Sequence, residues 1–229
     1  MLEDPPLLVV RKLVTRLPAD KLAKLSGAQT GHVVDAMDGR GALDAAIKPV
    51  DCNRAQFIGT ALTCETGPSD NLALVAAVAL AKPGDVIVAA ADAFTATAVI
   101  GDIVATMARN AGCAAIVIDG MARDSEGLVS AGLPIFCRGI TPNSCAKSGP
   151  GRVGLPVVAG GVAIESGDVL IGDRDGVVVV PQRLLDHVIA RVEVIREAEK
   201  KVLGMVAQGL TRMESIAALL KSDRVRYVE

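Results

Sequence analysis

The stretch that most constrains the fold of this chain is residues 83–128. An apolar run at 86–90 follows a Pro-Gly-Asp turn, and a second apolar run at 114–118 precedes an Asp-Gly turn. Between them, residues 103–108 carry apolar side chains at helical spacing, and Gly112 is placed to end that helix. Two almost wholly apolar strands joined through a helix predict a parallel βαβ unit whose sheet is buried on both faces.

Three charged residues are expected at one edge of this sheet. Ligands of such units gather beyond the carboxyl ends of the strands, and Asp102, Arg123 and Asp124 would all lie near that edge. Charges at the rim of an apolar sheet are solvated, paired with one another, or used to bind a ligand. The three residues by themselves do not decide between these roles.

Composition narrows the class of protein. The chain has 229 residues, 51% of them hydrophobic and 2% aromatic, which predicts one α/β domain with a core of Ala, Val, Leu and Ile. The net charge is −2 and the Lys and Arg residues are scattered, so we expect no nucleic-acid partner. The longest uncharged apolar run, 72–81, is too short to cross a bilayer, so we expect no membrane partner. The acidic start of the chain does not resemble a signal peptide.

Cysteine content and hydropathy give two further expectations. Five cysteines without a CxxC pair indicate reduced thiols in a cytoplasmic protein, and favour neither a zinc site nor a disulfide framework. A mean hydropathy of +0.43 with so few aromatics indicates apolar surface between subunits, so we expect a homo-oligomer.

Periodicity and turn residues predict the remaining elements. Helices are expected at 7–25, 32–37 (capped by Thr30), 71–81, 125–131, 183–202 and 213–220. Strands are expected at 47–50, 57–66, 134–137, 157–159, 162–164, 169–171 and 177–180, the last four forming a meander of antiparallel hairpins. Residues 139–154 are rich in Gly, Pro, Ser and Asn and are expected to form a loop.

One carboxylate of the long C-terminal helix lies in an apolar stripe. Glu199 falls four residues after Ile195 and three before Val202, so helical spacing places it among apolar positions. Such a carboxylate is costly to bury unless a cation meets it. The cation is either an Arg of the same or a neighbouring subunit, or a metal with its water shell, and the helix alone favours the Arg.

The acidic residues near the sheet edge point to a divalent cation. Asp102 and Asp124 would repel one another there, and a cation relieves that repulsion. Oxygen-only ligation with few side chains suits Mg²⁺ or Mn²⁺, which keep several waters.

An oxo acid fits the same edge. The helix after Gly101 presents free amides at its first residues, Asp102, Ile103 and Val104, which form a seat for a substrate carboxylate. Arg123 could hold a second oxygen of the same substrate. Together with the cation, these groups predict a site for a small 2-oxo acid whose enolate the metal would stabilise.

At these residues the sequence resembles a known family. The motif PGDVIV, Gly101-Asp102 and then Arg123-Asp124 within IDGMARD look like the class II pyruvate aldolases that cleave 4-hydroxy-4-methyl-2-oxoglutarate and 4-carboxy-4-hydroxy-2-oxoadipate. The same RraA-like superfamily includes the regulator of ribonuclease E activity. The resemblance covers most of the chain, through VVDAMDGRG (33–41), GTALTCE (59–65), SDN (69–71) and the stretch 155–181.

The resemblance implies a fold and a set of roles. The fold would be an αββα sandwich similar to swivelling phosphohistidine domains, with residues 1–229 as one RraA-like aldolase domain that has an N-terminal helix and a C-terminal helical extension. Asp124 would bind Mg²⁺ or Mn²⁺ directly, while Asp102 and Glu199, the latter from an adjacent subunit of a trimer or hexamer, would hold metal-bound waters. Arg123 would contact the 2-oxo oxygen, and the amides at Ile103 and Val104 the carboxylate.

The resemblance leaves two functions from different classes. The first is a metal-dependent lyase that releases pyruvate by retro-aldol cleavage and decarboxylates oxaloacetate by the same chemistry. The second is a non-catalytic protein that regulates a ribonuclease by binding, but that regulator lacks the Asp of the Arg-Asp pair, which this chain keeps as Asp124. One position departs from the active family members, which often carry Asp or Glu where this chain has Gly127. Lys147 has no obvious apolar pocket, which disfavours a Schiff-base aldolase.

Overall fold

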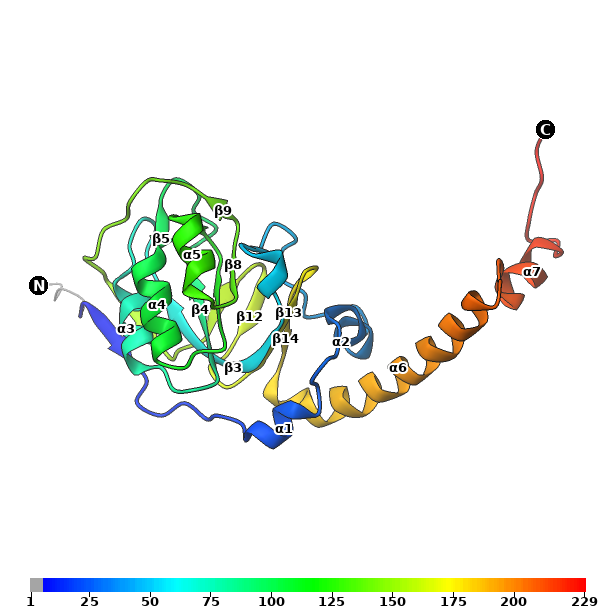
Figure 1. Ribbon diagram of the computed structural model, residues 1–229, viewed down its shortest axis with the longest axis horizontal. Coiled ribbons are helices and arrows are strands. Elements are labelled where there is room, and N and C mark those ends of the chain that lie inside the picture. The colour runs from blue at the N-terminus through cyan, green and yellow to red at the C-terminus, as the bar shows by residue number, and fades with distance from the viewer. Residues whose placement is uncertain (1–5) are drawn as a thin grey trace, which may run out of the picture. The chain divides into compact units, whose positions relative to one another are not determined.

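The computed structural model describes residues 6–229, and the chain divides into two compact units. The first unit ends at Val192 and the second comprises Glu193–Glu229. Figure 1 shows the elements of both units. That residues 1–229 act as one domain stays a prediction.

The structure is a mixed α/β fold. Its helices are α1 (Ala19–Ala23), α2 (Thr30–Ala36), α3 (Leu72–Leu80), α4 (Asp102–Asn110), α5 (Ser125–Ala131), α6 (Leu185–Ala207) and α7 (Glu214–Leu220), with 3-10 turns at Cys52–Arg54 and Gln182–Leu184. Its strands are β1 (Leu8–Val10), β2 (Lys48–Pro49), β3 (Phe57–Glu65), β4 (Asp85–Ala90), β5 (Ala98–Ile100), β6 (Ala115–Ile118), β7 (Met121–Ala122), β8 (Ile135–Cys137), β9 (Gly139–Ile140), β10 (Gly151–Val153), β11 (Val157–Ala159), β12 (Val162–Ile164), β13 (Val169–Asp173) and β14 (Gly176–Val180).

The predicted βαβ unit is at the centre of the largest sheet. Strands β4 and β6 pair in parallel, with Ile87 opposite Ile116, and helix α4 lies between them in the chain. Strand β3 pairs in parallel with the other side of β4. Within the described residues this sheet has nine strands in the order β1-β10-β3-β4-β6-β8-β2, and β13 and β14 extend from β3.

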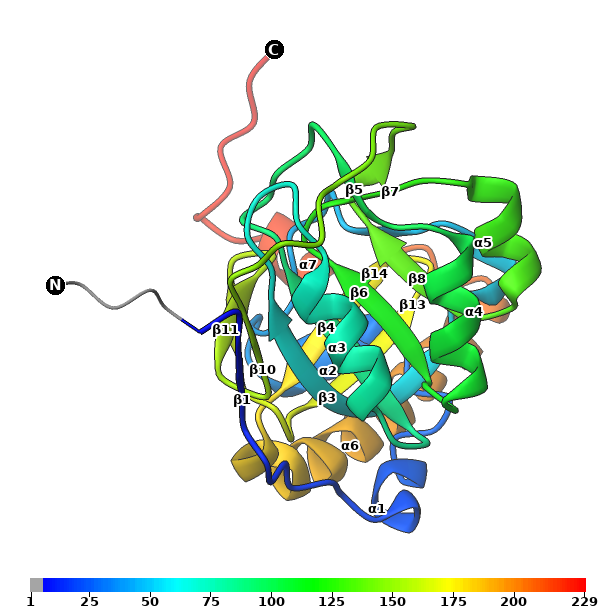
Figure 2. The ribbon, with the colours of Figure 1, turned by 90° about the vertical axis from the view of Figure 1, so that its left-hand side faces the viewer.

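Alternate residues of the central strands enter two separate cores. Ile87 and Ala89 of β4 pack into a cluster with buried residues of α3, α4 and α5, and Figure 2 shows α3 and α4 in front of the sheet. Val86 and Val88 pack into a cluster with Phe57, Phe136 and residues of β11, β13 and β14. The sheet is therefore covered on both faces, as its almost continuous apolar strands predict.

A second, three-stranded sheet was not expected from the sequence. Strands β5, β7 and β9 pair in parallel in that order. They have two or three residues each, which is too short for a periodic pattern to reveal them. This small sheet positions the candidate site, because α4 follows β5 and α5 follows β7.

The predicted helix at 7–25 is wrong. Its first part is the strand β1, which pairs in parallel with β10, and only Ala19–Ala23 is helical, starting after Pro18. A proline is disfavoured inside a helix, and the partner strand of β1 lies more than a hundred residues away in the chain. Leu7, Val9, Val10 and Leu13 of this segment are exposed, so its apolar spacing does not mark a buried helix face.

Three smaller predictions also need correction. Thr30 does not cap α2: it is the first helical residue, and its hydroxyl donates to Asp173 at 2.9 Å. The stretch 139–154 is not wholly a loop, because it contains β9 and β10. The two C-terminal hairpins, β11–β12 and β13–β14, form as expected, but they belong to different sheets and so do not make one meander.

The second unit carries the C-terminal part of α6 and helix α7. Glu199 is exposed on α6, as are apolar side chains of both helices, including Val194, Leu203 and Ile216. None of the helices in residues 6–229 combines the length and the apolar character needed to span a membrane.

Candidate functional site

The small sheet brings together two segments that the sequence singled out. Strands β5 and β7 are parallel neighbours with Ile100 opposite Ala122, and the backbone N–H of Arg123 donates to the carbonyl of Ile100 at 3.0 Å. Both strands therefore end at the same edge. Gly101-Asp102 leaves one strand and Arg123-Asp124 leaves the other, so the four residues meet where parallel strands commonly present ligand-binding groups.

Each carboxylate of the site packs against a glycine of the other segment. A Cβ added to Gly101 would overlap Oδ2 of Asp124, and one added to Gly127 would lie 2.5 Å from the Cβ of Asp102. At Gly127 the neighbour is a Cβ atom, which cannot rotate away, so this position requires the absence of a side chain; at Gly101 the neighbour is the end of the Asp124 side chain, which an added Cβ would displace. At Gly127 the space that a side chain would fill is occupied by Asp102.

Asp124 has an uncommon backbone conformation. It precedes α5 with φ 59° and ψ 50°, in the left-handed region that Asp tolerates better than most residues. Its side chain does not cap the helix, although Asp is a preferred capping residue. Non-glycine residues held in this region are concentrated at functional sites, and here the conformation leaves the carboxylate next to Gly101.

Arg123 is held by two partners at once. Its Nη1 donates to Oγ of Ser144 at 2.6 Å, and its Nε lies 3.3 Å from Oδ2 of Asp124. The two side chains of the ion pair remain 41% and 45% exposed. The guanidinium is thus oriented but still reachable by a ligand, which is the condition for recognising a planar oxo acid.

One predicted substrate contact is already occupied by the protein itself. The N–H of Ile103 donates to Oδ1 of Asp102 at 2.7 Å. Helix geometry leaves the first amides of α4 without acceptors inside the helix, so Asp102 takes one of the donors that we expected to meet a substrate carboxylate. A ligand that uses the Ile103 amide must displace the Asp102 carboxylate.

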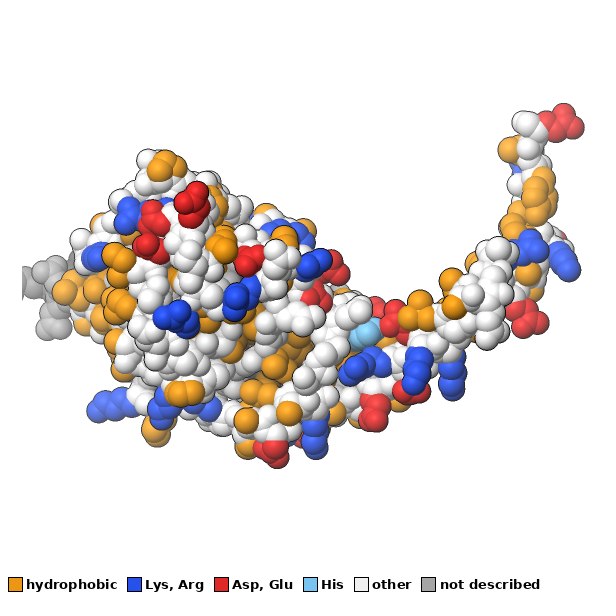
Figure 3. All heavy atoms as spheres, in the orientation of Figure 1, with side chains coloured by type: hydrophobic (Ala, Val, Ile, Leu, Met, Phe, Trp, Pro, Cys, Tyr) orange, Lys and Arg blue, Asp and Glu red, His pale blue; other side chains and the backbone are white. Residues whose placement is uncertain are grey.

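A cavity of about 120 Å³ contains the predicted residues of the first unit. Its wall includes Gly101, Asp102, Ile103, Val104, Arg123 and Asp124. Pockets for drug-sized ligands have about 300–1,000 Å³, so this cavity suits a small acid. A second hollow of about 490 Å³ shares Asp124 and continues along Ser125–Gly127 and Ile140–Pro142. Figure 3 shows acidic and basic side chains close together over the α4 and α5 region.

Besides the backbone of β5, the cavity is lined by four residues with polar or thiol side chains that the sequence analysis did not assign to it. They are Asn71, Ser144, Cys145 and Lys147. The three from the 144–147 segment lie on a stretch that composition marked only as a loop, and Lys147 is exposed there. Burial raises the pKa of the Cys145 thiol, and Asp70 adds to that effect, so the thiol stays protonated at neutral pH. Asn71 belongs to the SDN motif, which is the one sequence feature that could have indicated that Asn71 lies in the site.

The donor set in this unit is small for a metal site. Among residues 6–229, no group of three or more His, Cys, Asp and Glu side chains is placed to hold a metal ion. Mg²⁺, however, is commonly held by one or two carboxylates together with substrate oxygens and waters. The half-exposed Asp124 and the neighbouring Asp102 fit that pattern. Glu199 lies in the second unit, and its part in the site stays a prediction.

Comparison with known proteins gives the family. The model of the RraA-like family (Aldolase/RraA) matches residues 30–179, more than half of the chain. A protein of Halalkalibacterium halodurans, provisionally named 4-hydroxy-4-methyl-2-oxoglutarate aldolase, is 38% identical over 174 residues, which are 76% of this chain and 82% of the relative. This chain therefore belongs to the RraA-like family.

Two solved structures share the fold. RraAS2 of Streptomyces coelicolor, described as an unusual member of the RNase ES inhibitor RraA protein family, has a TM-score of 0.75 at 26% identity, over 83% of this chain and 100% of that one. The RNA-processing inhibitor RraA of Thermus thermophilis has a TM-score of 0.62 at 28% identity, over 68% of this chain and 93% of that one. The three proteins named above thus carry names of two kinds, aldolase and inhibitor of RNA processing.

Proposed function

We propose that this protein is a divalent-metal-dependent lyase. It cleaves 4-hydroxy-2-oxo dicarboxylic or tricarboxylic acids, of the 4-hydroxy-4-methyl-2-oxoglutarate type, to pyruvate and a second oxo acid, and it also decarboxylates oxaloacetate. The observation that carries the proposal is the convergence of the α4 amides, Arg123 and Asp124 on one small cavity. The aldolase name of the 38% identical relative supports the same reaction class.

In this proposal each residue of the cavity has a separate role in binding the metal or the substrate. Asp124, with its carboxylate half exposed beside Gly101, would hold Mg²⁺ or Mn²⁺, and Asp102 would hold the ion's waters. A bound divalent ion supplies positive charge that stabilises the negative charge developing on the oxo acid. Arg123 would donate to the 2-oxo oxygen through the guanidinium edge that Ser144 and Asp124 orient.

Cleavage breaks the C3–C4 bond while the 4-hydroxyl loses its proton and becomes the carbonyl of the second oxo acid, and the C3 enolate that remains takes up a proton to give pyruvate. Asp102 is the carboxylate in this cavity that could receive the proton through one water, since it lines the cavity and its Oδ1 accepts from the Ile103 amide at the start of α4. When Asp102 turns toward that water, the Ile103 amide becomes free for the substrate carboxylate. Proton uptake and carboxylate binding would then be coupled at one side chain.

A neighbouring subunit completes the proposal. Glu199 would reach the site from an adjacent copy in a homotrimer or homohexamer and hold a further water of the ion. The exposed apolar side chains on α4 and on the second unit, such as Ile103 and Val194, support association between copies. For the fold we propose an αββα sandwich like that of swivelling phosphohistidine domains, which the two cores on opposite faces of the sheet support.

A pyruvate-release assay tests the function. Purified protein is given 4-hydroxy-4-methyl-2-oxoglutarate or oxaloacetate with Mg²⁺, with EDTA, and with EDTA followed by excess Mg²⁺. We expect release in the first condition, loss in the second and recovery in the third. Release that EDTA does not change would contradict metal dependence, and no release from either substrate would contradict the lyase.

The second candidate is a protein that regulates a ribonuclease by binding. The structural likeness to the two RraA proteins favours it. Inhibition of a purified ribonuclease E-type enzyme by this protein, retained in an Asp124→Ala variant, would support regulation that is independent of the cavity. Absence of inhibition at micromolar protein would leave the lyase as the function.

A further inference from the structure

Asn71 occupies a capping position but does not cap its helix. It immediately precedes α3, and its side chain makes no hydrogen bond to the helix amides, although Asn is among the best capping residues. The neighbouring Asp70 replaces it, because Oδ1 of Asp70 accepts from the N–H of Leu72 at 2.8 Å. The Asn71 side chain is therefore not needed to cap α3.

The amide of Asn71 is turned toward the candidate site. Its Nδ2 donates to the carbonyl of Val99 at 3.0 Å, two residues before Gly101. This contact fixes the orientation of the amide, because the reverse orientation would set Oδ1 against another carbonyl oxygen. Asn71 is 5% exposed and lines the same cavity as Asp102 and Arg123.

The remaining atom of this amide has no partner. Within the described part of the chain, Oδ1 of Asn71 is buried and accepts no hydrogen bond. Most buried polar atoms in native proteins have a partner, so an orphan acceptor calls for a donor that arrives with a ligand or with water. Arg123, which lines the same cavity, does not donate to this oxygen, because its Nη1 donates to Ser144.

The surrounding backbone prevents Asn71 from moving to find another partner. The N–H of Asn71 donates to the carbonyl of Ala146 at 3.1 Å. Oδ2 of Asp70, which is 6% exposed, accepts from the amides of Ser148 at 2.6 Å and Gly149 at 3.0 Å. These contacts tie Asp70-Asn71 to the segment that carries Ser144 and Lys147, so the vacant acceptor is held rigidly in the wall.

We propose that Asn71 is a ligand-binding residue whose Oδ1 accepts a hydrogen bond from an O–H group that enters the cavity. The inference rests on the proposed lyase function, which offers two sources of that group: the hydroxyl of a 4-hydroxy-2-oxo acid, and a water held by the divalent ion. In either case Asn71 would bind a hydrogen-bond donor of the ligand. Arg123 and Lys147, the cationic residues of the same wall, would bind anionic oxygens.

Two substitutions separate the role of the Oδ1 acceptor of Asn71 from that of its Nδ2 donor. Asn71→Leu removes both the acceptor and the donor to Val99, whereas Asn71→Asp keeps an acceptor and removes the donor. Asn143→Leu is the matched control, since the Asn143 amide also donates to a backbone carbonyl, that of Ala96 at 3.0 Å, but does not line the cavity. Each variant is measured as the full-length protein for melting temperature, for Mn²⁺ affinity by titration, and for cleavage of 4-hydroxy-4-methyl-2-oxoglutarate and decarboxylation of oxaloacetate.

The outcomes identify the source of the donor. If it is the substrate hydroxyl, Asn71→Leu lowers kcat/KM for the hydroxy acid by about tenfold or more, a larger factor than its loss with oxaloacetate, which has no alcohol group. Mn²⁺ affinity is then unchanged, and Asn71→Asp retains more activity than Asn71→Leu. If it is the water, Asn71→Leu weakens Mn²⁺ binding itself. Equal activity of Asn71→Leu and wild type, or equal losses in both Asn71 variants with unchanged Mn²⁺ affinity, would overturn the inference. A wild-type protein that neither binds Mn²⁺ nor cleaves the hydroxy acid would instead overturn the proposed function.

Discussion

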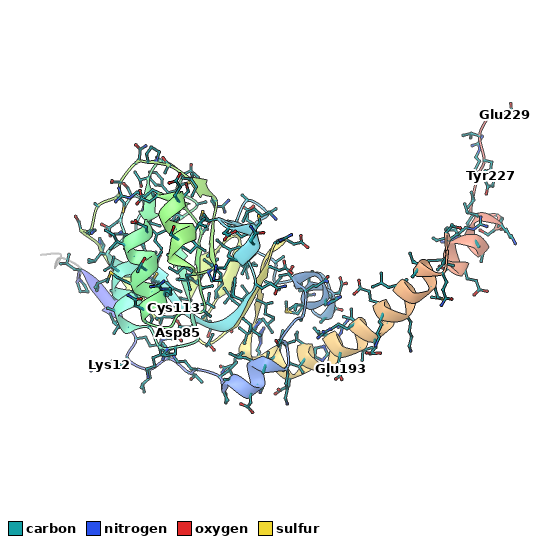
Figure 4. All side chains as sticks on the ribbon, in the orientation of Figure 1. Lys12, Asp85, Cys113, Glu193, Tyr227 and Glu229 are labelled. Carbon is teal, nitrogen blue, oxygen red and sulfur yellow. The ribbon has the colours of Figure 1, made fainter. Side chains whose placement is uncertain are left out.

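Two Arg–Asp pairs in the first unit differ in how fully their hydrogen-bonding capacity is used. At the amino end of β4, Arg16 binds Asp85 through Nε and Nη2, each at 2.8 Å, and the N–H of Lys82 adds a third donor at 2.8 Å. Asp85 is 1% exposed, and its hydrogen bond raises the pKa of Arg16. Figure 4 shows Asp85 beside Cys113 at this end of the unit, where burial raises the pKa of the Cys113 thiol to about 11.

The second pair, Arg123 and Asp124, has the same two residue types but is more exposed to solvent. Arg123 meets Asp124 through one contact of 3.3 Å, and both side chains are more than two-fifths exposed. Asp85 accepts from three donors of the protein, which is typical of a structural pair, whereas the exposed Asp124 keeps capacity to bind a ligand.

The largest effect is expected at Asp124. Asp124→Ala removes the carboxylate that would hold the metal, so kcat for pyruvate release should fall by at least about 10³-fold. Because the side chain is exposed and does not cap α5, the urea midpoint should stay close to that of the wild type. Full activity in this variant would show that the metal site lies elsewhere.

Asp85→Ala should have the opposite signature. It leaves the Arg16 guanidinium without its partner in a mostly buried place, and breaking such a pair costs about 3–5 kcal/mol. Equilibrium urea unfolding measures this loss, and activity per folded molecule should change little. The double variant Arg16→Leu/Asp85→Leu, which removes both charges, should be more stable than Asp85→Ala. A single variant as stable as the wild type would remove the structural half of the comparison.

Arg123→Lys tests whether the open pair needs a planar cation. The guanidinium reaches Ser144 and Asp124 with different nitrogens, and a single ammonium cannot reproduce both contacts. We expect a loss of about 10²-fold in kcat/KM with little change in Mn²⁺ affinity. A lysine variant with wild-type kcat/KM would show that charge alone is sufficient.

The two glycines give a smaller and more local effect. Gly127→Ala places a methyl group against Asp102, so Mn²⁺ affinity should fall by about tenfold, as for other groups that orient metal-site residues. Gly31→Ala is the control, because it also lies in a helix but has open space around it, and it should leave the affinity unchanged. Equal Mn²⁺ affinity in both variants would mean that Asp102 does not act on the metal.

The smallest expected effect concerns the cavity thiol. Burial raises the pKa of Cys145, so its alkylation by iodoacetamide at pH 7 should be slow and should speed up as the pH rises above the ordinary thiol range. The exposed Cys52 should react faster at pH 7. Peptide mass spectrometry measures both sites, and pyruvate with Mg²⁺ should protect Cys145 without affecting Cys52. Faster labelling of Cys145 than of Cys52 at pH 7 would contradict its burial.

The sequence predicted the parts of the fold that depend on long apolar patterns. The βαβ unit of β4, α4 and β6, and helix α5, lie where periodicity placed them. The failures are segments whose structure depends on distant partners. Strand β1 exists because β10 pairs with it, and β5 and β7 are too short to show a period.

The same distinction applies to the candidate site. Asp102, Arg123 and Asp124 were expected near one edge of the βαβ sheet. The structure brings them to one cavity, at the edge of the small β5-β7 sheet instead, and their roles stay predictions. Asn71 and Lys147 could not be assigned in this way, because contacts of Asp70 with the amides of Ser148 and Gly149 bring their segments together. The contacts of Asp124 with Gly101 and of Asp102 with Gly127 likewise depend on how α4 packs against α5.

A crystal structure of the full-length protein soaked with pyruvate and Mg²⁺ would show whether the cavity holds both. We expect an ion about 2.0–2.1 Å from a carboxylate oxygen of Asp124, with pyruvate between that ion and Arg123. We also expect Glu199 of an adjacent copy near the waters of the ion. Density for ion and pyruvate at another place, or a well-ordered Asp124 that ligates nothing, would contradict the proposed site.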